Sequence, residues 1–270
     1  SFNEALRQEV DIRPAESLYV QTPQNRSIQV FIVKPHDFDP HKRYPLIMNV
    51  HGGPQMQWSD TFRGDWQVYP GAGYIVAFPN PTGSTGYGQA FTEGISKDWD
   101  GKVMEDIMAV ADHLAELPYV DKDRMGAMGW SWGGYAMMWL EGHNPGRFKA
   151  LAAMMGIYDL PSFYGATEEL WFPTWDIGGT PWENPEAYAR PNPAGAVKDF
   201  ATPCLVITGE KDYRVPYTQS LQFFTALQQR QVPSRLIVFP EDGHWPHQMR
   251  AMPVYYNAHL EWFHQFLGGE

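Results

Sequence analysis

The sequence predicts an α/β protein in which a mainly parallel central sheet is covered by helices on both faces. Short apolar runs alternate along the chain with segments of helical spacing, which is the pattern of strand–helix–strand units. The middle runs are apolar throughout, as expected for strands that are buried on both faces. The first two runs are separated only by a turn, and they predict an antiparallel edge.

The N-terminal region starts with residues 1–16, which are polar and predict a lead-in arm. Ser17–Thr22 and Ile28–Lys34 contain β-branched and aromatic residues and predict two strands, with the turn at Pro23–Arg26. The remaining strands are expected in six apolar runs: Pro45–His51, Tyr74–Pro79, Arg124–Met128, Ala150–Met155, Pro203–Thr208 and Ser234–Pro240.

Helices are expected between these strands. Lys102–Leu117 has apolar residues at 103, 104, 107, 108, 110, 111, 114 and 115, which is the spacing of a helix packed on a sheet, and Pro118 ends it. Gly134–Leu140, Tyr217–Arg230 and Pro253–Leu267 predict three more helices.

Three long connections join these elements. Gln55–Gly73 is expected to be an aromatic loop or a short helix, and Asn80–Gly88 a loop. Gly156–Asp199 is rich in aromatic residues and Pro and has no clean periodicity. Because no repeat, low-complexity tract or linker interrupts the chain, residues 1–270 are expected to form a single domain.

Composition argues against several classes of protein. Asp and Glu outnumber Lys and Arg by 31 to 20, and the net charge of −11 makes a nucleic-acid partner unexpected. No run approaches the roughly 18 apolar residues of a membrane span. No signal peptide is visible, although a chain that begins with Ser leaves a missing upstream segment open. We expect a soluble protein, and the sequence leaves the choice between cytoplasm and periplasm open.

The single cysteine, Cys204, excludes an internal disulfide, so the fold does not depend on an oxidising compartment. No Cys/His or histidine–carboxylate spacing indicates a metal site, and no cofactor is expected.

The stretch Gly129-Trp130-Ser131-Trp132-Gly133 has the pattern G-x-S-x-G between an expected strand and an expected helix. In that context it predicts a nucleophile elbow, a sharp turn that exposes a serine hydroxyl at a helix N-terminus. The residues two before and two after the serine crowd each other, so they must be small. The helix N-terminus favours a developing oxyanion. The alternative is a glycine-rich turn that merely contains serine.

Ser131, Asp212 and His244 follow three expected strands and should meet at one edge of the sheet. Their order is that of the α/β-hydrolase fold. His244 would accept the serine proton and return it to the leaving group, and Asp212 would orient the imidazole. The competing base is His247, the competing acid is Asp159, and a solvated loop residue is the alternative for Asp212.

Such a site needs an oxyanion hole made of two backbone N–H groups. One is expected from Trp132, directly after the nucleophile. The other is expected from the loop His51-Gly52-Gly53-Pro54, where Gly53 lets the backbone approach a substrate closely. A plain strand-to-loop turn is the alternative interpretation of this loop.

Three stretches resemble the catalytic domain of the prolyl oligopeptidase family of serine peptidases: Gly129–Tyr135, Gly209–Pro216 and Asp242–His244. The His51–Pro54 loop and Pro181–Pro185 look most like its acylaminoacyl-peptidase and dipeptidyl-peptidase branch. The resemblance covers nearly the whole chain, and it implies the α/β-hydrolase fold.

The resemblance also implies that Ser131, Asp212 and His244 match the catalytic triad of the family. Relatives release short peptides or acylated amino acids from peptide N-termini. Family members usually have an N-terminal β-propeller that screens the active site, and the strands before residue 45 cannot form one. The chain is therefore expected to be either an excised catalytic domain or a minimal hydrolase with an open site, which would suit small esters.

In the family, an apolar pocket accepts the side chain on the acyl side of the scissile bond. The stretch Tyr158–Trp175 is expected to fold back over the nucleophile. There it would line this pocket together with Trp132, or it would only pack as a lid. Arg214 would donate to a substrate carbonyl or form a surface salt bridge. The residues expected to bind substrate are Phe163, Tyr164, Trp171, Phe172, Arg214 and Val215.

The sequence therefore predicts a serine hydrolase that works through an acyl-enzyme. We expect a peptidase that cleaves short peptides or acyl-aminoacyl substrates with an apolar acyl-side residue. The alternative is a carboxylesterase, which uses the same machinery on small acyl esters. A non-catalytic binding module would be expected to have a broken triad. The sequence predicts no oligomeric state.

Overall fold

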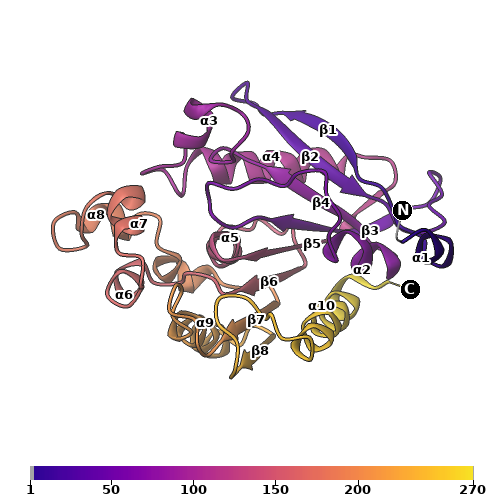
Figure 1. Cartoon of the computed structure of the whole chain (residues 1–270). Coiled ribbons are helices and arrows are strands. Elements are labelled where there is room, and N and C mark those ends of the chain that lie inside the picture. Colours follow the sequence, from indigo (N-terminus) through magenta and orange to yellow (C-terminus); the bar gives the residue numbers. More distant parts are fainter. Residues whose placement is uncertain (1–2, 270) are drawn as a thin grey trace.

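One eight-stranded sheet forms the centre of the structure, a computed structural model that describes residues 3–269 (Figure 1). The six strands β3 to β8 run parallel, whereas β1 and β2 are antiparallel to their neighbours. The predicted parallel sheet with an antiparallel edge is therefore confirmed. In spatial order the strands are β1 (Glu16–Gln21), β2 (Ser27–Val33), β4 (Ile75–Asn80), β3 (Tyr44–Val50), β5 (Val120–Trp130), β6 (Ala150–Met154), β7 (Cys204–Gly209) and β8 (Ser234–Phe239).

The central strands are buried on both faces, as their continuous apolar sequences predict. Every residue of β4, β6 and β7 is buried. On β3, Leu46 and Met48 belong to the core on one side of the sheet and Ile47 to the core on the other, because successive side chains of a strand point in opposite directions. The outer strands β1 and β8 are largely exposed or half-buried.

Helices cover both faces of the sheet (Figure 1). The apolar residues of α4 (Lys102–Ala115), α5 (Trp132–Glu141) and α9 (Thr218–Gln229) belong to one core. Those of α2 (Asp65–Gly71) and α10 (Ala251–Leu267) belong to the other. Helix α4 buries one apolar stripe against the strands, which is the arrangement that its spacing of apolar residues predicted, whereas α5 is buried along almost its whole circumference.

Residues 156–199, which we call the lid segment, form a chain of short helices at one end of the molecule (Figure 1). None of these helices is longer than seven residues, which explains why the sequence shows no clean periodicity here. In order they are α6 (Leu160–Tyr164), α7 (Trp171–Pro173), the π-helix η1 (Thr174–Gly178), α8 (Pro185–Ala189) and the 3₁₀-helix η2 (Pro193–Asp199).

Some boundaries differ from the predicted ones. Part of the expected N-terminal arm is a helix, α1 (Glu4–Glu9), in which Glu4 adds a favourable acidic residue to the first turn. A second short helix, α3 (Gln89–Glu93), follows the Asn80–Gly88 loop. β5 starts at Val120, before the apolar run, because Val120 pairs with Tyr44 ahead of a register shift. Residues 1 and 2 of the predicted arm lie outside the described residues.

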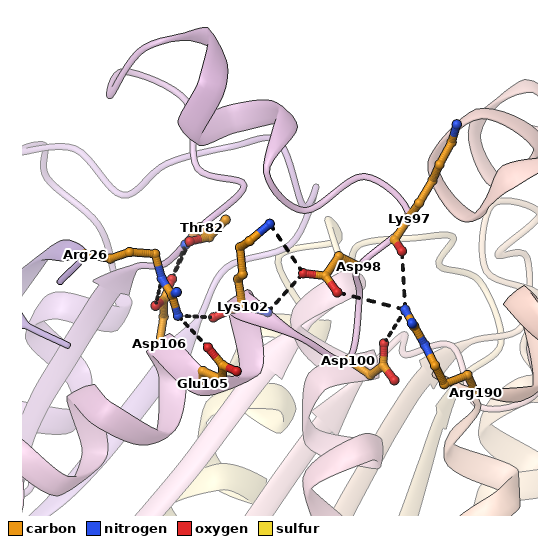
Figure 2. Close-up of polar contacts among 9 residues, drawn as sticks. All are labelled: Arg26, Thr82, Lys97, Asp98, Asp100, Lys102, Glu105, Asp106 and Arg190. Atoms are coloured by element: carbon orange, nitrogen blue, oxygen red, sulfur yellow. Dashed lines mark hydrogen bonds and ion pairs between the residues drawn. The ribbon is translucent and has the colours of Figure 1, made fainter. Parts of the chain in front are cut away.

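Arg26, in the turn between β1 and β2, attaches the antiparallel edge to α4 (Figure 2). Its guanidinium donates to Asp106 at 2.7 Å and to Glu105 at 2.8 Å. The fully buried Asp106 also accepts from the backbone N–H and hydroxyl of Thr82, at 2.9 and 2.5 Å. The loop after β4 is therefore held against α4 as well.

Candidate active site

Ser131 lies in the turn between β5 and α5 with φ 62° and ψ −120°, a backbone conformation that residues other than glycine rarely adopt. Its N–H donates to the carbonyl of Met154 on β6, at 2.9 Å. A Cβ on Gly129 would lie 2.3 Å from the carbonyl oxygen of Gly133, and a Cβ on Gly133 would lie 2.1 Å from that of Val50. The predicted crowding on either side of the serine is therefore confirmed.

The loops after β7 and β8 contain Asp212 and His244 and lie in backbone contact with each other. Gly209, the last residue of β7, is so close to the second loop that a Cβ there would lie 2.1 Å from the carbonyl oxygen of Gly243. This contact brings the side chains of Asp212 and His244 together at the carboxyl edge of the sheet, where ligands bind in parallel α/β folds.

Ser131, His244 and Asp212 form a continuous hydrogen-bonded series. His244 Nε2 is 2.9 Å from Ser131 Oγ, and His244 Nδ1 is 2.7 Å from Asp212 Oδ2. The other oxygen of the buried Asp212 carboxylate accepts from the backbone N–H groups of Arg214 at 3.0 Å and Val215 at 2.9 Å. Because a carboxylate only accepts, Nδ1 holds the imidazole proton and Nε2 is free to accept the serine proton.

Trp130 supports the loop of the histidine. Its indole N–H donates to the backbone carbonyl of His244 at 2.7 Å, and its ring centroid is 5.0 Å from that of the imidazole. Trp245 packs edge-on against the same indole at 4.9 Å. The residue before the nucleophile therefore helps to fix the position of the histidine.

The two competing residues have other contacts. The side chain of His247 is 69% exposed, and its Nδ1 lies 3.4 Å from Asp242. Asp159 caps helix α6 by accepting from the N–H of Ser162 at 3.1 Å, and it accepts from the Asn192 amide at 3.0 Å. Neither His247 nor Asp159 belongs to the series that includes Ser131.

The loop after β3 passes directly beside the nucleophile. A Cβ on Gly52 would lie 2.9 Å from the Cβ of Ser131 and 3.5 Å from its Oγ. Gly53 has φ 117°, a left-handed conformation that favours glycine. Trp132 is the first residue of α5, so its N–H has no acceptor within the helix. The backbones of Gly53 and Trp132 therefore both border the space in front of Ser131.

His51 follows β3 directly and contacts the glycine loop that comes after it. Its buried imidazole donates from Nδ1 to the carbonyl of Gly52 at 2.8 Å, and its Nε2 is 2.8 Å from Ser84 Oγ. Burial lowers the pKa of His51 to about 4, so the ring is neutral near neutral pH. The side chain braces the glycine loop.

A cavity of about 380 Å³ opens in front of Ser131. Five of the six residues predicted to bind substrate line it, and so do several residues that the sequence did not single out for this role. The predicted ones are Phe163, Trp171, Phe172, Arg214 and Val215; the others include Gln55, Met56, Ile157 and Glu169.

Tyr164 does not line this cavity, so the prediction for this residue is corrected. Its ring packs edge-on against Trp182 and Tyr188, with centroid distances of 5.5 and 5.8 Å. Phe163 and Tyr164 are adjacent on the helix α6, and adjacent helical side chains point about 100° apart. Phe163 therefore lies at the cavity while Tyr164 packs within the lid segment.

Arg214 forms the salt bridges that the sequence left open, while it also lines the cavity. Its Nη2 is 3.2 Å from Glu168 and its Nε is 3.2 Å from Glu169. Nothing in the spacing of these residues indicates the pairing, because Glu168 lies 46 positions away in the chain. Ion pairs this exposed contribute little to stability, about 0–1 kcal/mol each.

Within residues 3–269, no group of three or more His, Cys, Asp or Glu side chains is arranged to hold a metal ion. None of the helices in that range combines the length and the apolarity needed to cross a membrane.

Several known proteins are similar to this chain in sequence or in structure. Dipeptidyl-peptidase 5 of Schizosaccharomyces pombe is 42% identical over 246 residues, which cover 89% of this chain and 36% of that protein. Dipeptidyl-peptidase 5 of Porphyromonas gingivalis is 36% identical over 271 residues, covering 98% of this chain and 40% of that protein.

A solved structure of an acylaminoacyl peptidase in complex with Z-Gly-Gly-Phe-chloromethyl ketone superimposes on the whole chain with a TM-score of 0.93, at 26% identity, and the chain covers 44% of it. The chain thus spans less than half of the length of these relatives. The profile of the prolyl oligopeptidase family matches residues 60–270. Since that match includes the elbow, both triad loops and most of the sheet, the chain belongs to the prolyl oligopeptidase family.

Proposed function

We propose that residues 1–270 form a single catalytic domain that acts as a serine peptidase. In this proposal Ser131 is the nucleophile, His244 is the general base and acid, and Asp212 orients the imidazole. The observation that supports it best is the series Ser131–His244–Asp212, with distances of 2.9 and 2.7 Å, at an elbow where the serine has a strained backbone.

The geometry fits the two half-reactions of acyl transfer. His244 accepts the hydroxyl proton as Ser131 Oγ attacks the substrate carbonyl, and the imidazolium is stabilised by Asp212. The N–H groups of Trp132 and Gly53 donate to the oxyanion. The histidine then protonates the leaving amine, which leaves an acyl-enzyme. Water, activated by the same histidine, releases the acyl group and restores the serine.

The cavity supports an apolar residue on the acyl side of the scissile bond. Phe163, Phe172 and Val215 form apolar parts of its wall. The similar acylaminoacyl peptidase was solved with an inhibitor that has Phe next to its reactive group. Two relatives are named dipeptidyl-peptidases. We therefore infer that the natural substrates are peptides, from whose N-termini a dipeptide or an acylated amino acid is released.

One experiment tests both the reaction and the substrate class. One sample of the purified chain is treated with a fluorophosphonate probe, which labels only an activated serine, and a separate untreated sample is assayed on three substrates. These are a dipeptidyl anilide ending in Phe, an N-acetyl-Phe anilide and a short-chain p-nitrophenyl ester.

Labelling together with turnover of at least one anilide would support the peptidase. Turnover of the ester with no turnover of either anilide would replace this proposal with a carboxylesterase. Absence of labelling would refute a serine-hydrolase function altogether.

A further inference from the structure

Asp176, in the π-helix η1 of the lid segment, is a fully buried carboxylate that the proposed reaction does not use. Three neutral side chains donate to it: Gln55 Nε2 at 2.9 Å, Ser96 Oγ at 2.7 Å and Trp99 Nε1 at 2.5 Å. π-Helical turns are rare and often occur at functional sites. Asp176 therefore joins the lid segment to two other parts of the chain, the loop at Gln55 and the segment Ser96–Trp99.

Stability alone does not explain a carboxylate in this position. A buried charge is costly unless it is paired, and an apolar side chain of similar size is often at least as stable. Among the described residues, no cation forms an ion pair with Asp176. Arg190, which lines the adjacent cavity with Asp176, instead lies 3.0 Å from Asp100 and 3.9 Å from Asp98 (Figure 2).

Gln55 connects Asp176 to the loop beside the nucleophile. It follows Gly53 and Pro54 directly, and it is one of the residues that line the cavity in front of Ser131. The backbone turns so tightly that a Cβ on Gly53 would lie 2.8 Å from the backbone nitrogen of Gln55. A displacement of Gln55 therefore also displaces Gly53, whose N–H is assigned to the oxyanion hole above.

Further contacts hold Asp176 against the segment Lys97–Trp99. Its backbone carbonyl accepts from the N–H of Lys97 at 2.6 Å, and the carbonyl of Lys97 accepts from Arg190 at 3.3 Å (Figure 2). The lid segment thus binds both the backbone N–H and the backbone carbonyl of Lys97. Trp99 packs edge-on against Trp132, the residue after the nucleophile, at 6.1 Å. The carboxylate has a fixed position from which to hold Gln55.

We propose that Asp176 is a positioning residue for the oxyanion hole: from the lid segment it holds Gln55 and, through it, the backbone of Gly53 beside the nucleophile. The proposal rests on the proposed serine-peptidase function. It also implies that the lid segment, which forms the wall of the acyl-side pocket, is coupled to the group that stabilises the transition state. Mispositioning a catalytic group by about 1 Å can lower a rate by about 10²-fold.

The test is a double-mutant cycle with Asp176→Asn, Gln55→Met and the double variant, and with Ser96→Ala as the matched control. Gln55→Met keeps the length of the side chain but loses the donor to Asp176. Ser96→Ala removes a different donor to the same carboxylate oxygen. Thermal unfolding of each variant is measured, with kcat and KM for the p-nitrophenyl ester. A peptide aldehyde that forms a tetrahedral adduct gives an inhibition constant for each variant.

We expect Asp176→Asn and Gln55→Met each to lower kcat by about 10- to 100-fold with KM changed little, because the loss concerns the transition state. The inhibition constant of the aldehyde should rise by the same factor. The double variant should be no slower than the slower single variant. Ser96→Ala should keep its kcat, although its unfolding temperature falls.

The outcomes separate this inference from the proposed function. An inactive wild type that no fluorophosphonate labels would refute the function and with it the inference. An active wild type with unchanged kcat in a folded Asp176→Asn or Gln55→Met variant would refute the positioning role alone. Multiplicative losses in the double variant, or an equal loss in Ser96→Ala, would do the same. Should Asp176→Asn not fold, Gln55→Met against Ser96→Ala decides.

Discussion

The elbow around Ser131 and the lid segment of residues 156–199 line the same cavity but are built in different ways. The elbow depends on backbone geometry, because its glycines have no room for a methyl group and Ser131 has a left-handed φ. The lid segment depends on its side chains, because its short helices are held by contacts between aromatic rings and by hydrogen bonds to distant residues. We infer from this difference that backbone geometry positions the proposed nucleophile, whereas side-chain packing in the lid segment shapes the proposed acyl-side pocket.

The largest effect on activity is expected when the hydroxyl of Ser131 is removed and the backbone of the elbow is left in place. Ser131→Ala is expected to lower kcat for esters and anilides by about 10⁶-fold, because no other group can form the acyl-enzyme. The fold should persist, since the backbone bonds of residue 131 do not involve its side chain. Steady-state rates and circular dichroism check both parts. Turnover within about tenfold of wild type would show that Ser131 is not the nucleophile.

A single methyl group should distinguish the two regions. Gly133→Ala is expected to cost about 3 kcal/mol in the free energy of unfolding, because its Cβ would lie 2.1 Å from the Val50 carbonyl. It should also lower kcat by about 10²-fold through displacement of the nucleophile. Gly165→Ala in the lid segment is the control, since the nearest atom to its Cβ would be 3.7 Å away. Urea unfolding of both variants measures the loss in the free energy of unfolding, and equal losses would contradict a difference between the two regions.

Side-chain changes in the lid segment should alter specificity instead. Phe172→Ala is expected to reduce the preference for Phe over Gly on the acyl side by about tenfold in kcat/KM, because the apolar wall of the cavity is lost. Tyr164→Ala is the matched control, since that ring packs on Trp182 and Tyr188 away from the cavity. The measurement is kcat/KM over N-acyl anilides of Gly, Ala, Leu, Phe, Lys and Glu. A ranking that only Tyr164→Ala changes would reverse our assignment of these two residues.

A smaller effect is expected on the pH dependence of the free energy of unfolding, and it comes from three buried groups outside the lid segment: His51, Glu141 and His259. Burial lowers the pKa of His51 and of His259 to about 4, so both stay neutral in the fold but bind protons when the chain unfolds. Burial raises the pKa of Glu141 to about 8, so the fold keeps a proton that the unfolded chain releases.

The two effects have opposite signs. The contribution of the histidines is present above their unfolded pKa of about 6.5 and is lost as the pH falls towards 4. The contribution of Glu141 is present at low pH and is lost as the pH rises through about 8. With two histidines against one glutamate, these groups should give a maximum of stability near about pH 6.5. Urea unfolding across this range tests it, and Glu141→Gln should remove the decline on the alkaline side.

The sheet, and the residues that meet at its carboxyl edge, could be predicted from the order of residues along the chain. Continuous apolar runs locate strands such as Ile75–Asn80 and Cys204–Gly209, because burial on both faces favours apolar side chains at successive positions. The residues after those runs lie at one edge by topology alone, which is why Ser131, Asp212 and His244 could be selected without coordinates. Their catalytic roles stay predictions until the variants are measured.

The surroundings of that edge depend on contacts that become visible in the folded molecule. Tyr164 was predicted to line the pocket, but the sequence of a five-residue helix does not show which side of it faces the cavity. The pairing of Arg214 with Glu168 and Glu169, and the bond between Asp176 and Gln55 across 121 positions, are equally invisible in the sequence. The physical reason is that strands have a period of two and pair by topology, whereas short helices and loops are placed by contacts with residues that are distant in the chain.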